Sequence, residues 1–444
     1  MSKESKVLSR RNVLKTLGAV GAYSITASGL THASTQINAT NDVNFPKIPA
    51  GLSPELLAQD ESFWAKVAQL YDKAQGIVNL EHGYWGKMSL PVQSSFIEAT
   101  KMVNTQLSFY ARKSYNKDTE KSTIKVAEAL GAQAEEIVLT RNATESVHNL
   151  IRQYKDLGEN DTVLFTDIDY PSFKETMQWL ASSRNQKAVE VVLPAQANQQ
   201  QIIDLYTQAF DKHPNLKLML LTHVSNQHGL VLPVKKIAKI AKQRGIDVIC
   251  DCAQSWGLLN FKITDLGVDW AGFNLHKWIG SPVGVGALYM KKGSLEKISP
   301  YPGEHDANNT NASTRVHTAT TNFASILTIP AAINFHQSIG PANKEARLRH
   351  LRSLWTSEAK NMPHIEVLGG LDEESSTGMC SFRLQGKTSL DDAKHLQKRL
   401  ENQFGVFTVL RKGLASGCCI RITPQIFISA TEVQQLVKAM KALA

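Results

Sequence analysis

Two hydrophobic periods alternate along most of the chain. From about residue 76 onward, short apolar runs of strand length are separated by segments with apolar residues at helical spacing, such as residues 235–244. The expected strands cover residues 136–140, 162–165, 189–193, 216–222, 247–250, 269–273 and 285–290. Strands that alternate with helices predict an α/β fold with a mostly parallel, seven-stranded sheet and helices on both of its faces.

The pattern changes after the last of these strands. Residues 299–322 are rich in Pro, Asn, Thr and Gly and show no period, which predicts a long loop that is either functional or mobile. A helix is expected from about Ser325 through residues 348–359. Strands are expected after it near residues 364–368, 378–384, 405–409 and 418–423. A closing helix is expected at residues 431–443.

These patterns predict two domains behind an N-terminal extension. Residues 76–324 would form a large domain, and residues 325–444 a small α+β C-terminal domain. Residues 34–75 are interpreted as a linker and an N-terminal helix, which would begin at Pro54 after Ser53 and continue to Lys73.

Residues 1–33 have the features of an export signal. Ser9-Arg10-Arg11-Asn12-Val13-Leu14-Lys15 resembles a twin-arginine motif, a Gly/Ala-rich apolar stretch follows, and Thr31-His32-Ala33 suits a signal peptidase. The apolar stretch is too short and too interrupted for a membrane span. We therefore expect recognition by the twin-arginine export machinery, a periplasmic location and no membrane anchor. An ordinary disordered, basic N-terminus is the alternative.

Composition narrows the classes of partner. The formal net charge of the chain is +9, and it falls by four, to +5, without residues 1–33. A net charge of +5 on a chain this long does not predict a nucleic-acid-binding surface. The five cysteines are odd in number, and Cys250, Cys418 and Cys419 lie in apolar runs, which favours buried thiols over disulfides. Cys250-x-Cys252 lacks a second pair at zinc spacing, so no metal site is expected.

Two ionisable residues follow apolar strands in unusual surroundings. Asp251 comes directly after residues 246–250, where a carboxylate is costly unless it is paired. Lys277 follows the strand at 269–273 and precedes several glycines, and a desolvated lysine has the lowered pKa that imine chemistry needs. Taken alone, Asp251 could instead cap a helix that begins near Cys252, and Lys277 could be an ordinary surface lysine.

Together these residues predict a site for pyridoxal phosphate (PLP), because the carboxyl ends of parallel strands meet at one edge of a sheet. Lys277 would hold PLP as a Schiff base, and Asp251 would keep the pyridine nitrogen protonated. Gln254 could donate to the phenolate oxygen. Free backbone N–H groups near Ala143 and Thr144, at an expected helix start, suit a phosphate, although such turns also cap ordinary helices.

The same segments resemble the class V aminotransferase family. That group of fold-type I PLP enzymes includes cysteine desulfurases, isopenicillin N epimerase and periplasmic pyoverdine-tailoring enzymes. The resemblance covers roughly residues 76–444 and rests on Asn142-Ala143-Thr144-Glu145, His223-Val224-Ser225-Asn226, Asp251-x-Ala253-Gln254, His276-Lys277 and Arg421-Ile422-Thr423-Pro424. Twin-arginine export is similar to the pyoverdine-tailoring branch in particular.

The resemblance implies a role for each matching residue. Besides the catalytic Lys277 with Asp251 and Gln254, the residues that would hold the phosphate are Ala143, Thr144, Asn274 and His276. Tyr170 would stack on the ring, where desulfurases carry a histidine. Asn226 and Arg421 would bind the substrate carboxylate, which suits the planar guanidinium. Thr320, with Ala319 in place of the family's glycine, would reach the phosphate of the neighbouring subunit in a homodimer.

The resemblance also bears on the reaction. Desulfurases carry a reactive cysteine on a loop before the carboxylate-binding arginine, whereas here the turn Arg411-Lys412-Gly413 leads into Leu414-Ala415-Ser416, so desulfuration is not expected. We expect transamination at Cα of an amino acid or a peptide-linked amino acid. The alternatives are epimerisation, oxidative decarboxylation of a siderophore side chain, and binding without turnover. Tyr84 and Trp85 would either line the pocket mouth or simply pack.

Overall fold

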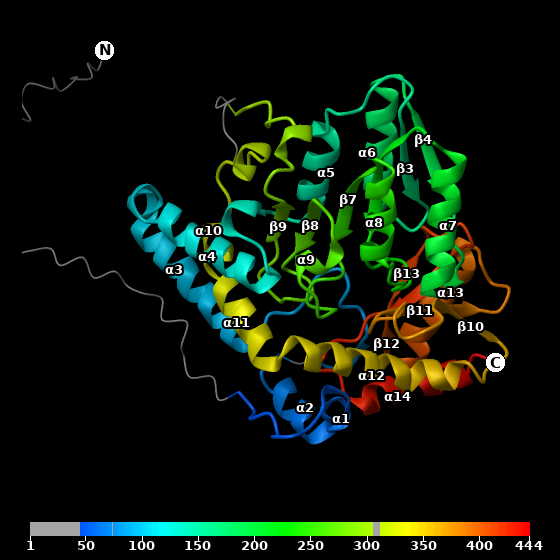
Figure 1. Cartoon of the computed structure of the whole chain (residues 1–444). Helices are drawn as coiled ribbons and strands as arrows, with labels where there is room; N and C mark the ends of the chain where they lie inside the picture. The colour runs from blue at the N-terminus through cyan, green and yellow to red at the C-terminus, as the bar shows by residue number, and fades with distance from the viewer. Residues whose placement is uncertain (1–44, 73, 305–310) are drawn as a thin grey trace, which may run out of the picture. The chain divides into compact units, whose positions relative to one another are not determined.

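The computed structural model describes residues 45–72, 74–304 and 311–444 (Figure 1). The expected export signal at 1–33 and residues 34–44 of the expected linker lie outside the described residues. The described residues belong to one compact unit, Asn38–Ala444. The domain boundary expected between residues 324 and 325 therefore stays a prediction.

The central element is a seven-stranded sheet, which confirms the predicted fold class. Its strand order is β2-β9-β8-β7-β6-β3-β4, and β9 is antiparallel to both of its neighbours while the other pairs are parallel. Each strand begins and ends within two residues of its expected position. The strands are β2 (Ile137–Thr140), β3 (Thr162–Thr166), β4 (Lys187–Val191), β6 (Leu216–Thr222), β7 (Asp247–Cys252), β8 (Trp270–Asn274) and β9 (Gly286–Met290).

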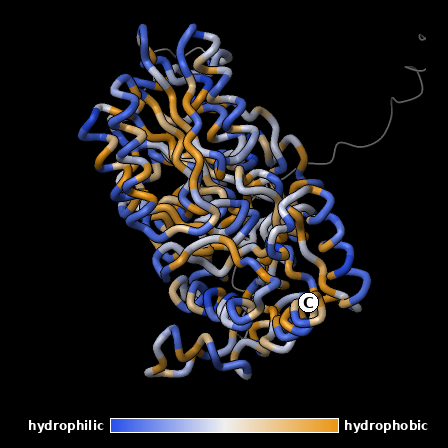
Figure 2. Tube along the Cα trace, turned by 90° about the vertical axis from the view of Figure 1, so that its right-hand side faces the viewer, coloured by the Kyte–Doolittle hydropathy of each residue, from blue (hydrophilic) through white to orange (hydrophobic). Residues whose placement is uncertain are grey.

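Helices cover both faces of this sheet, because its central strands are apolar on both sides. On one face, Leu150 of α5 and Phe173 of α6 pack in a cluster with Val163 of β3. On the other face, Ile237 of α8 packs in a cluster with Met219 of β6. Figure 2 shows the hydrophobic strands enclosed by more hydrophilic segments. The helices between the strands are α5 (Ala143–Gln153), α6 (Pro171–Ser182), α7 (Gln199–Lys212), α8 (Val234–Gln243) and α9 (Ile263–Leu266).

Two long helices precede the sheet and meet helices that follow it. These are α3 (Leu90–Lys113) and α4 (Tyr115–Leu130), which lie beside α10 (Phe323–Leu327) and α11 (Ile329–Ile339) in Figure 1. Short 3-10 helices complete this part of the chain, at Ala134–Glu136, Leu295–Lys297 and Ala312–Arg315.

Three of the expected boundaries are wrong. The helix expected from Pro54 to Lys73 is two helices, α1 (Pro54–Gln59) and α2 (Glu61–Ala68), because Asp60 accepts hydrogen bonds from two backbone N–H groups and starts the second helix. The helix expected from Ser325 to residue 359 is α10, α11 and α12 (Pro341–Ala359), with Gly340 at φ +85° before the proline that opens α12. The strand expected at 405–409 is β12 (Val406–Phe407) and β13 (Val409–Arg411).

A five-stranded sheet forms the C-terminal part. Its order is β13-β14-β11-β10-β5, and α13 and α14 pack with it. Val78–Asn79 (β1) pairs with β12, and Glu81 forms a bridge with Thr423, so the segment before the main sheet crosses to this part. The elements are β5 (Gln196–Ala197), β10 (Ile365–Gly370), β11 (Cys380–Leu384), β14 (Cys419–Ile422), α13 (Leu390–Phe404) and α14 (Ala430–Lys441).

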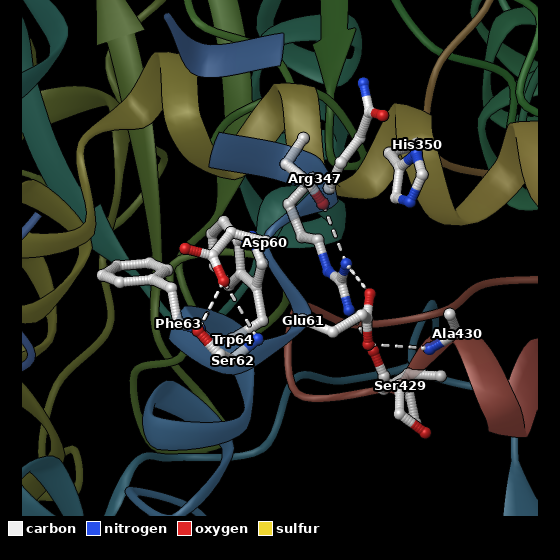
Figure 3. Close-up of polar contacts among 12 residues, drawn as sticks. Asp60, Glu61, Ser62, Phe63, Trp64, Arg347, His350, Ser429 and Ala430 are labelled. Atoms are coloured by element: carbon white, nitrogen blue, oxygen red, sulfur yellow. Dashed lines mark hydrogen bonds and ion pairs between the residues drawn. The ribbon is translucent and has the colours of Figure 1, made fainter. Parts of the chain in front are cut away.

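A buried arginine on α12 joins the N-terminal helices to the start of α14. Figure 3 shows Arg347 directed at Glu61, whose other oxygen accepts a hydrogen bond of 3.1 Å from Ala430 N. Arg347 also donates to Ala58 O at 2.9 Å and to Ile428 O at 3.0 Å. The guanidinium therefore ties three segments that are remote in sequence.

All five cysteines are buried free thiols, as their apolar surroundings predicted. Among the described residues, no helix is both long enough and apolar enough to cross a membrane.

Candidate active site

A cleft of about 960 Å³ opens at the carboxyl ends of the central strands. The positions where strands β6, β7 and β8 end supply its floor, and residues 79–87 and 407–411 supply much of its wall. Of the residues predicted for the site, those that line the cleft are Thr144, Tyr170, Asn226, Asp251, Gln254, Asn274, His276, Lys277 and Arg421. The cleft thus brings together residues that are nearly 280 positions apart in the sequence.

Lys277 and Asp251 have perturbed pKa values at the floor of the cleft. Burial lowers the pKa of Lys277 to about 8, while the charge of Asp251 opposes this shift. Burial raises the pKa of Asp251 to about 7, against the opposing effects of a backbone hydrogen bond and of Lys277. Each group therefore stabilises the charged form of the other, but not enough to offset its desolvation.

Asp251 has capacity for a cationic partner. Its Oδ1 accepts a hydrogen bond of 2.8 Å from Ala253 N, and no hydrogen bond to Oδ2 is found among the described residues. The alternative that Asp251 caps a helix is wrong, because β7 continues to Cys252 and turns follow it. A buried carboxylate with a free oxygen fits the protonated ring nitrogen of the expected cofactor.

The start of helix α5 presents free donors to the same cleft. Ala143 N donates to Asn274 Oδ1 at 2.8 Å, and Asn142 Oδ1 accepts from Glu145 N at 2.8 Å. Neither the backbone N–H nor the hydroxyl of Thr144 has a hydrogen-bond partner among the described residues. A helix N-terminus with free donors fits a phosphate group.

His276 is held in one orientation beside this helix start. Its Nδ1 lies 2.8 Å from Val285 O and, because a carbonyl only accepts, Nδ1 carries the proton. Burial lowers the pKa of His276 to about 4, so the imidazole is neutral and Nε2 is an acceptor. A phosphate near Nε2 would favour the protonated imidazolium, which is the form that can donate to it.

Gln254 is bonded to the protein at both ends of its amide. Its Oε1 accepts from Trp278 Nε1 at 2.9 Å, and its Nε2 donates to Gly83 O at 2.9 Å. One N–H of the amide is left for the predicted contact with the phenolate oxygen. Tyr170, at the start of α6, is 38% exposed and faces the cleft with its ring centroid 5.2 Å from that of Phe173.

Arg421 is already paired with a carboxylate of the same chain. Its Nη2 lies 2.7 Å from Glu81 Oε1, with the side chains 2% and 9% exposed, and its Nη1 donates to Asn226 O at 2.7 Å. Asn226 thus contacts Arg421 through its backbone, while its buried side-chain Oδ1 has no partner. A substrate carboxylate could reach Arg421 Nη2 only if Glu81 moved.

Residues 79–86 form the other side of the cleft. Gly86 N donates to His276 O at 2.7 Å, and a Cβ at Gly86 would lie 1.7 Å from Lys277 O, so only glycine fits there. Tyr84 and Trp85 are 73% and 52% exposed and line the cleft mouth, so the alternative of simple packing is wrong. This segment therefore positions the backbone of Lys277 from outside the main sheet.

Four charged residues that line the cleft were not predicted for the site, namely Glu81, Lys87, Arg141 and Arg411. Glu81 was not singled out, although it is the lone acid in an aromatic, Gly-containing segment, which is the signal that could have found it. Arg411 was considered only for the missing cysteine after it, yet it lines the cleft beside Arg421. Thr320 is exposed and lies outside the cleft lining, so its contact with a neighbouring subunit stays a prediction.

The turn after Arg411 is tied to the large sheet and carries no cysteine. Gly413 N donates to Gln227 Oε1 at 3.1 Å, and Ala415 N donates to Asp167 Oδ2 at 2.9 Å. The nearest thiols along the chain, Cys418 and Cys419, are buried, and burial raises the pKa of Cys419 to about 11.

Comparisons with known proteins agree on one family. A family model described as aminotransferase class V matches residues 99–436. The isopenicillin N epimerase of Amycolatopsis lactamdurans is 23% identical over 400 residues, which cover 86% of this chain and 98% of that protein. The cysteine desulfurase of Haloferax volcanii is 27% identical over 341 residues, which cover 72% and 77%.

Solved structures share the fold. A mutant of C-DES with glycine covalently linked to its PLP cofactor superposes with a TM-score of 0.72 at 21% identity, over 82% of this chain and 96% of that one. The cysteine desulfurase CsdA of Escherichia coli also gives a TM-score of 0.72, at 20% identity and over 85% and 98% of the two chains. At such identities the likeness establishes the fold and leaves the reaction open.

Proposed function

Because the chain belongs to the aminotransferase class V family of PLP-dependent enzymes, we propose that it transfers the amino group of an amino acid or a peptide-linked amino acid. The observation that carries this proposal is the placement of Lys277 and Asp251 at the floor of one cleft, at the ends of adjacent parallel strands. When bound, PLP supplies the electron sink that makes the substrate Cα proton acidic.

The residues of the chain have separate tasks in this proposal. Asp251 would hold the proton on the ring nitrogen, and Thr144, Asn274 and His276 would hold the phosphate. Ala143, which the resemblance also assigned to the phosphate, is outside the cleft lining and donates its N–H to Asn274 Oδ1. Lys277 would move the proton from Cα, and burial lowers its pKa, which favours the neutral amine that a general base needs. Tyr170, at the start of α6, would cover the ring.

Amino-group transfer can use one base on one face, because the proton that leaves Cα is delivered to the carbon on the other side of the substrate nitrogen. Lys277 suffices for this, whereas epimerisation needs a proton delivered to the opposite face of Cα as well. Epimerisation remains the second candidate because the isopenicillin N epimerase similarity spans 86% of this chain. Oxidative decarboxylation of a siderophore side chain is the further alternative from the resemblance to pyoverdine-tailoring enzymes.

Desulfuration is the reaction of several relatives, and the cleft gives a reason against it here. A persulfide-forming cysteine must reach the substrate sulfur, yet the turn at 411–416 has none and is bonded to Gln227 and Asp167. Cys418 and Cys419 are buried and absent from the cleft lining. We therefore propose chemistry that moves protons and the amino group at Cα.

The test is a product analysis with the purified, PLP-loaded full chain. Amino acids are added in deuterated water, and the cofactor absorbance, the keto acid and the deuterium at Cα are measured. Keto acid in a 1:1 ratio to enzyme, without an amino acceptor, supports transfer. Deuterium at Cα with no keto acid would replace the proposal by epimerisation, and sulfide release from cysteine would replace it by desulfuration. Lys291→Ala changes an exposed residue outside the cleft lining, and this control variant should give the same products as the wild type.

We further propose that the enzyme is exported to the periplasm by the twin-arginine route and works as a homodimer. Support comes from the motif at Arg10 and Arg11, and from the exposed position of Thr320 outside its own cleft. Arg10→Lys combined with Arg11→Lys should retain the protein in the cytoplasmic fraction. Sedimentation should give twice the mass of the chain, and a fully active monomer would contradict the dimer.

A further inference from the structure

We propose that Arg411 forms a second anion subsite in the cleft, so that the substrate is an amino acid with an acidic side chain. This inference rests on the proposed function for the reacting amino group. The subsite itself rests on the placement of Arg411 and on its lack of a side-chain partner among the described residues.

The register of two strands places Arg411 beside Arg421. β13 is antiparallel to β14, and Val409 lies opposite Arg421. Residues two apart on a strand point to the same face, so Arg411 shares the face of Val409 and is a diagonal neighbour of Arg421, at about 7–8 Å between backbones. All three residues line the cleft. The cleft therefore holds two guanidinium groups on one wall.

Only one of the two guanidinium groups has a counter-ion. Glu81 uses Oε1 for Arg421 and for Tyr84 N, at 2.7 and 3.0 Å, and Oε2 accepts from the Thr423 hydroxyl at 3.2 Å. No side-chain hydrogen bond or ion pair of Arg411 is found among the described residues, and its Nε is buried without a partner. Arg411 is therefore free to bind a ligand.

The charge balance of the wall favours an anion. Within the part of the chain that the structure describes, the acidic side chains that line the cleft are Glu81 and Asp251, and Asp251 faces Lys277. Burial and then the charge of Arg421 lower the pKa of Arg411 to about 10, against the opposing charge of Glu81. The guanidinium stays charged at neutral pH, in a place where only a bound anion would relieve its desolvation and the repulsion from Arg421.

A carboxylate is the group that fits this position. Guanidinium binds a carboxylate through two parallel N–H···O bonds, and the α-carboxylate is expected at Arg421, where it would displace Glu81 from Nη2. The remaining anionic group of the substrate must therefore lie on its side chain. Glutamate and glutamine test this directly, because they have nearly the same shape and differ in charge.

The first experiment measures binding without turnover. Calorimetry on the PLP-loaded full chain compares succinate, glutarate and adipate with their monoamides. We expect the best dicarboxylate to bind roughly tenfold or more tightly than its monoamide, as for a hydrogen-bonded charge. Arg411→Gln should bring this ratio close to one, and Arg411→Lys should restore part of it. A ratio unchanged in Arg411→Gln would overturn the subsite.

The second experiment measures the reaction. The rate of cofactor absorbance change is compared for glutamate with glutamine and for aspartate with asparagine. Arg411→Gln should lower the preference for the acid roughly tenfold while the amide rate stays within about threefold. Lys412→Gln removes the same charge from an exposed neighbour outside the cleft lining, and it should leave the preference unchanged.

The two experiments separate the subsite from the reaction. If no amino acid changes the cofactor spectrum while the dicarboxylate preference still depends on Arg411, the proposed transfer fails and the subsite stands. If transfer proceeds with the same acid preference in Arg411→Gln, the subsite fails and the transfer stands. Cofactor loading and thermal melting of Arg411→Gln show whether the variant is folded.

Discussion

Two regions of this molecule bury arginine in opposite ways. Arg347 of α12 is fully buried, and Figure 3 shows it directed at Glu61. Its Nη atoms also donate to the carbonyls of Ala58 and Ile428. Its guanidinium also lies 5.4 Å from the centre of the Trp64 ring. In the cleft, Arg411 has no partner for its guanidinium among the described residues.

The same contrast holds for the other charged groups of the two regions. Glu61 accepts from Arg347 and Ala430, whereas Asp251 has one backbone donor and Lys277 has no hydrogen bond among the described residues. A buried charge whose terminal atoms are paired within the protein holds segments together, while one whose terminal atoms are unpaired is available to a ligand. The contacts of Arg347 therefore stabilise the fold, whereas the charged groups of the cleft are available for binding and chemistry.

The largest expected effect is on catalysis, from Lys277→Ala. This variant should lower the turnover rate by roughly 10³-fold or more, because it removes the general base and the attachment point of the cofactor. Its unfolding free energy without cofactor should not fall, because the lysine is desolvated without a hydrogen bond. Activity assays and urea unfolding measure the two quantities, and a large loss of stability would break the contrast between the regions.

Arg347→Ala should have the reverse effect. Breaking a buried ion pair costs about 3–5 kcal/mol of unfolding free energy, and the low end applies here because Glu61 is 43% exposed and can be hydrated. The activity for each correctly folded molecule should stay close to that of the wild type, since Arg347 lies outside the cleft lining. The observation against this prediction would be a variant with normal stability and lowered turnover.

Asp251→Asn should change how the stability of the cofactor-free protein depends on pH. The pKa of Asp251 is about 7 in the folded state against an ordinary value of 3.8, so the folded state binds more protons between these values. Stability is therefore lost as the pH rises from about 4 to 7, by at most about 1.4 kcal/mol for each pH unit. The asparagine variant lacks this loss. Burial also raises the pKa of Asp169 to about 6. Asp169 is present in both proteins, so its contribution to the pH dependence cancels when they are compared.

Denaturation of both proteins at pH 4.5 and pH 7.5 measures this difference. The variant should gain stability relative to the wild type at the higher pH. Equal pH dependence in the two proteins would mean that Asp251 is adequately partnered without the cofactor.

The smallest effect is expected for an exposed ion pair. Lys121 and Asp118 lie 2.8 Å apart on α4, and the lysine side chain is 61% exposed. Lys121→Ala should change the unfolding free energy by less than about 0.5 kcal/mol, because solvent already screens both charges. A loss of unfolding free energy as large as that of Arg347→Ala would show that the loss of a charge, whether buried or exposed, is enough to destabilise the protein.

Much of this site could be predicted from local patterns. The strands of the main sheet carry apolar runs bounded by turns, and parallel strands bring their carboxyl ends together, so Asp251, Asn274 and Lys277 were expected to meet. Helix boundaries were less predictable. Asp60 and Gly340 interrupt apolar patterns that continue on both sides, and only the packing of α1 and α10–α12 shows where each helix ends.

The sequence by itself determined the family, the cofactor and the residues that the strand ends bring together, because each depends on short segments and their order. The tertiary structure alone decided that Glu81 pairs with Arg421, 340 positions away, and that Gly86 packs against the backbone of Lys277. It also left Arg411 without a counter-ion among the residues that the structure describes. Which charges find partners depends on which remote segments meet, and no local pattern of hydrophobic and polar residues records that.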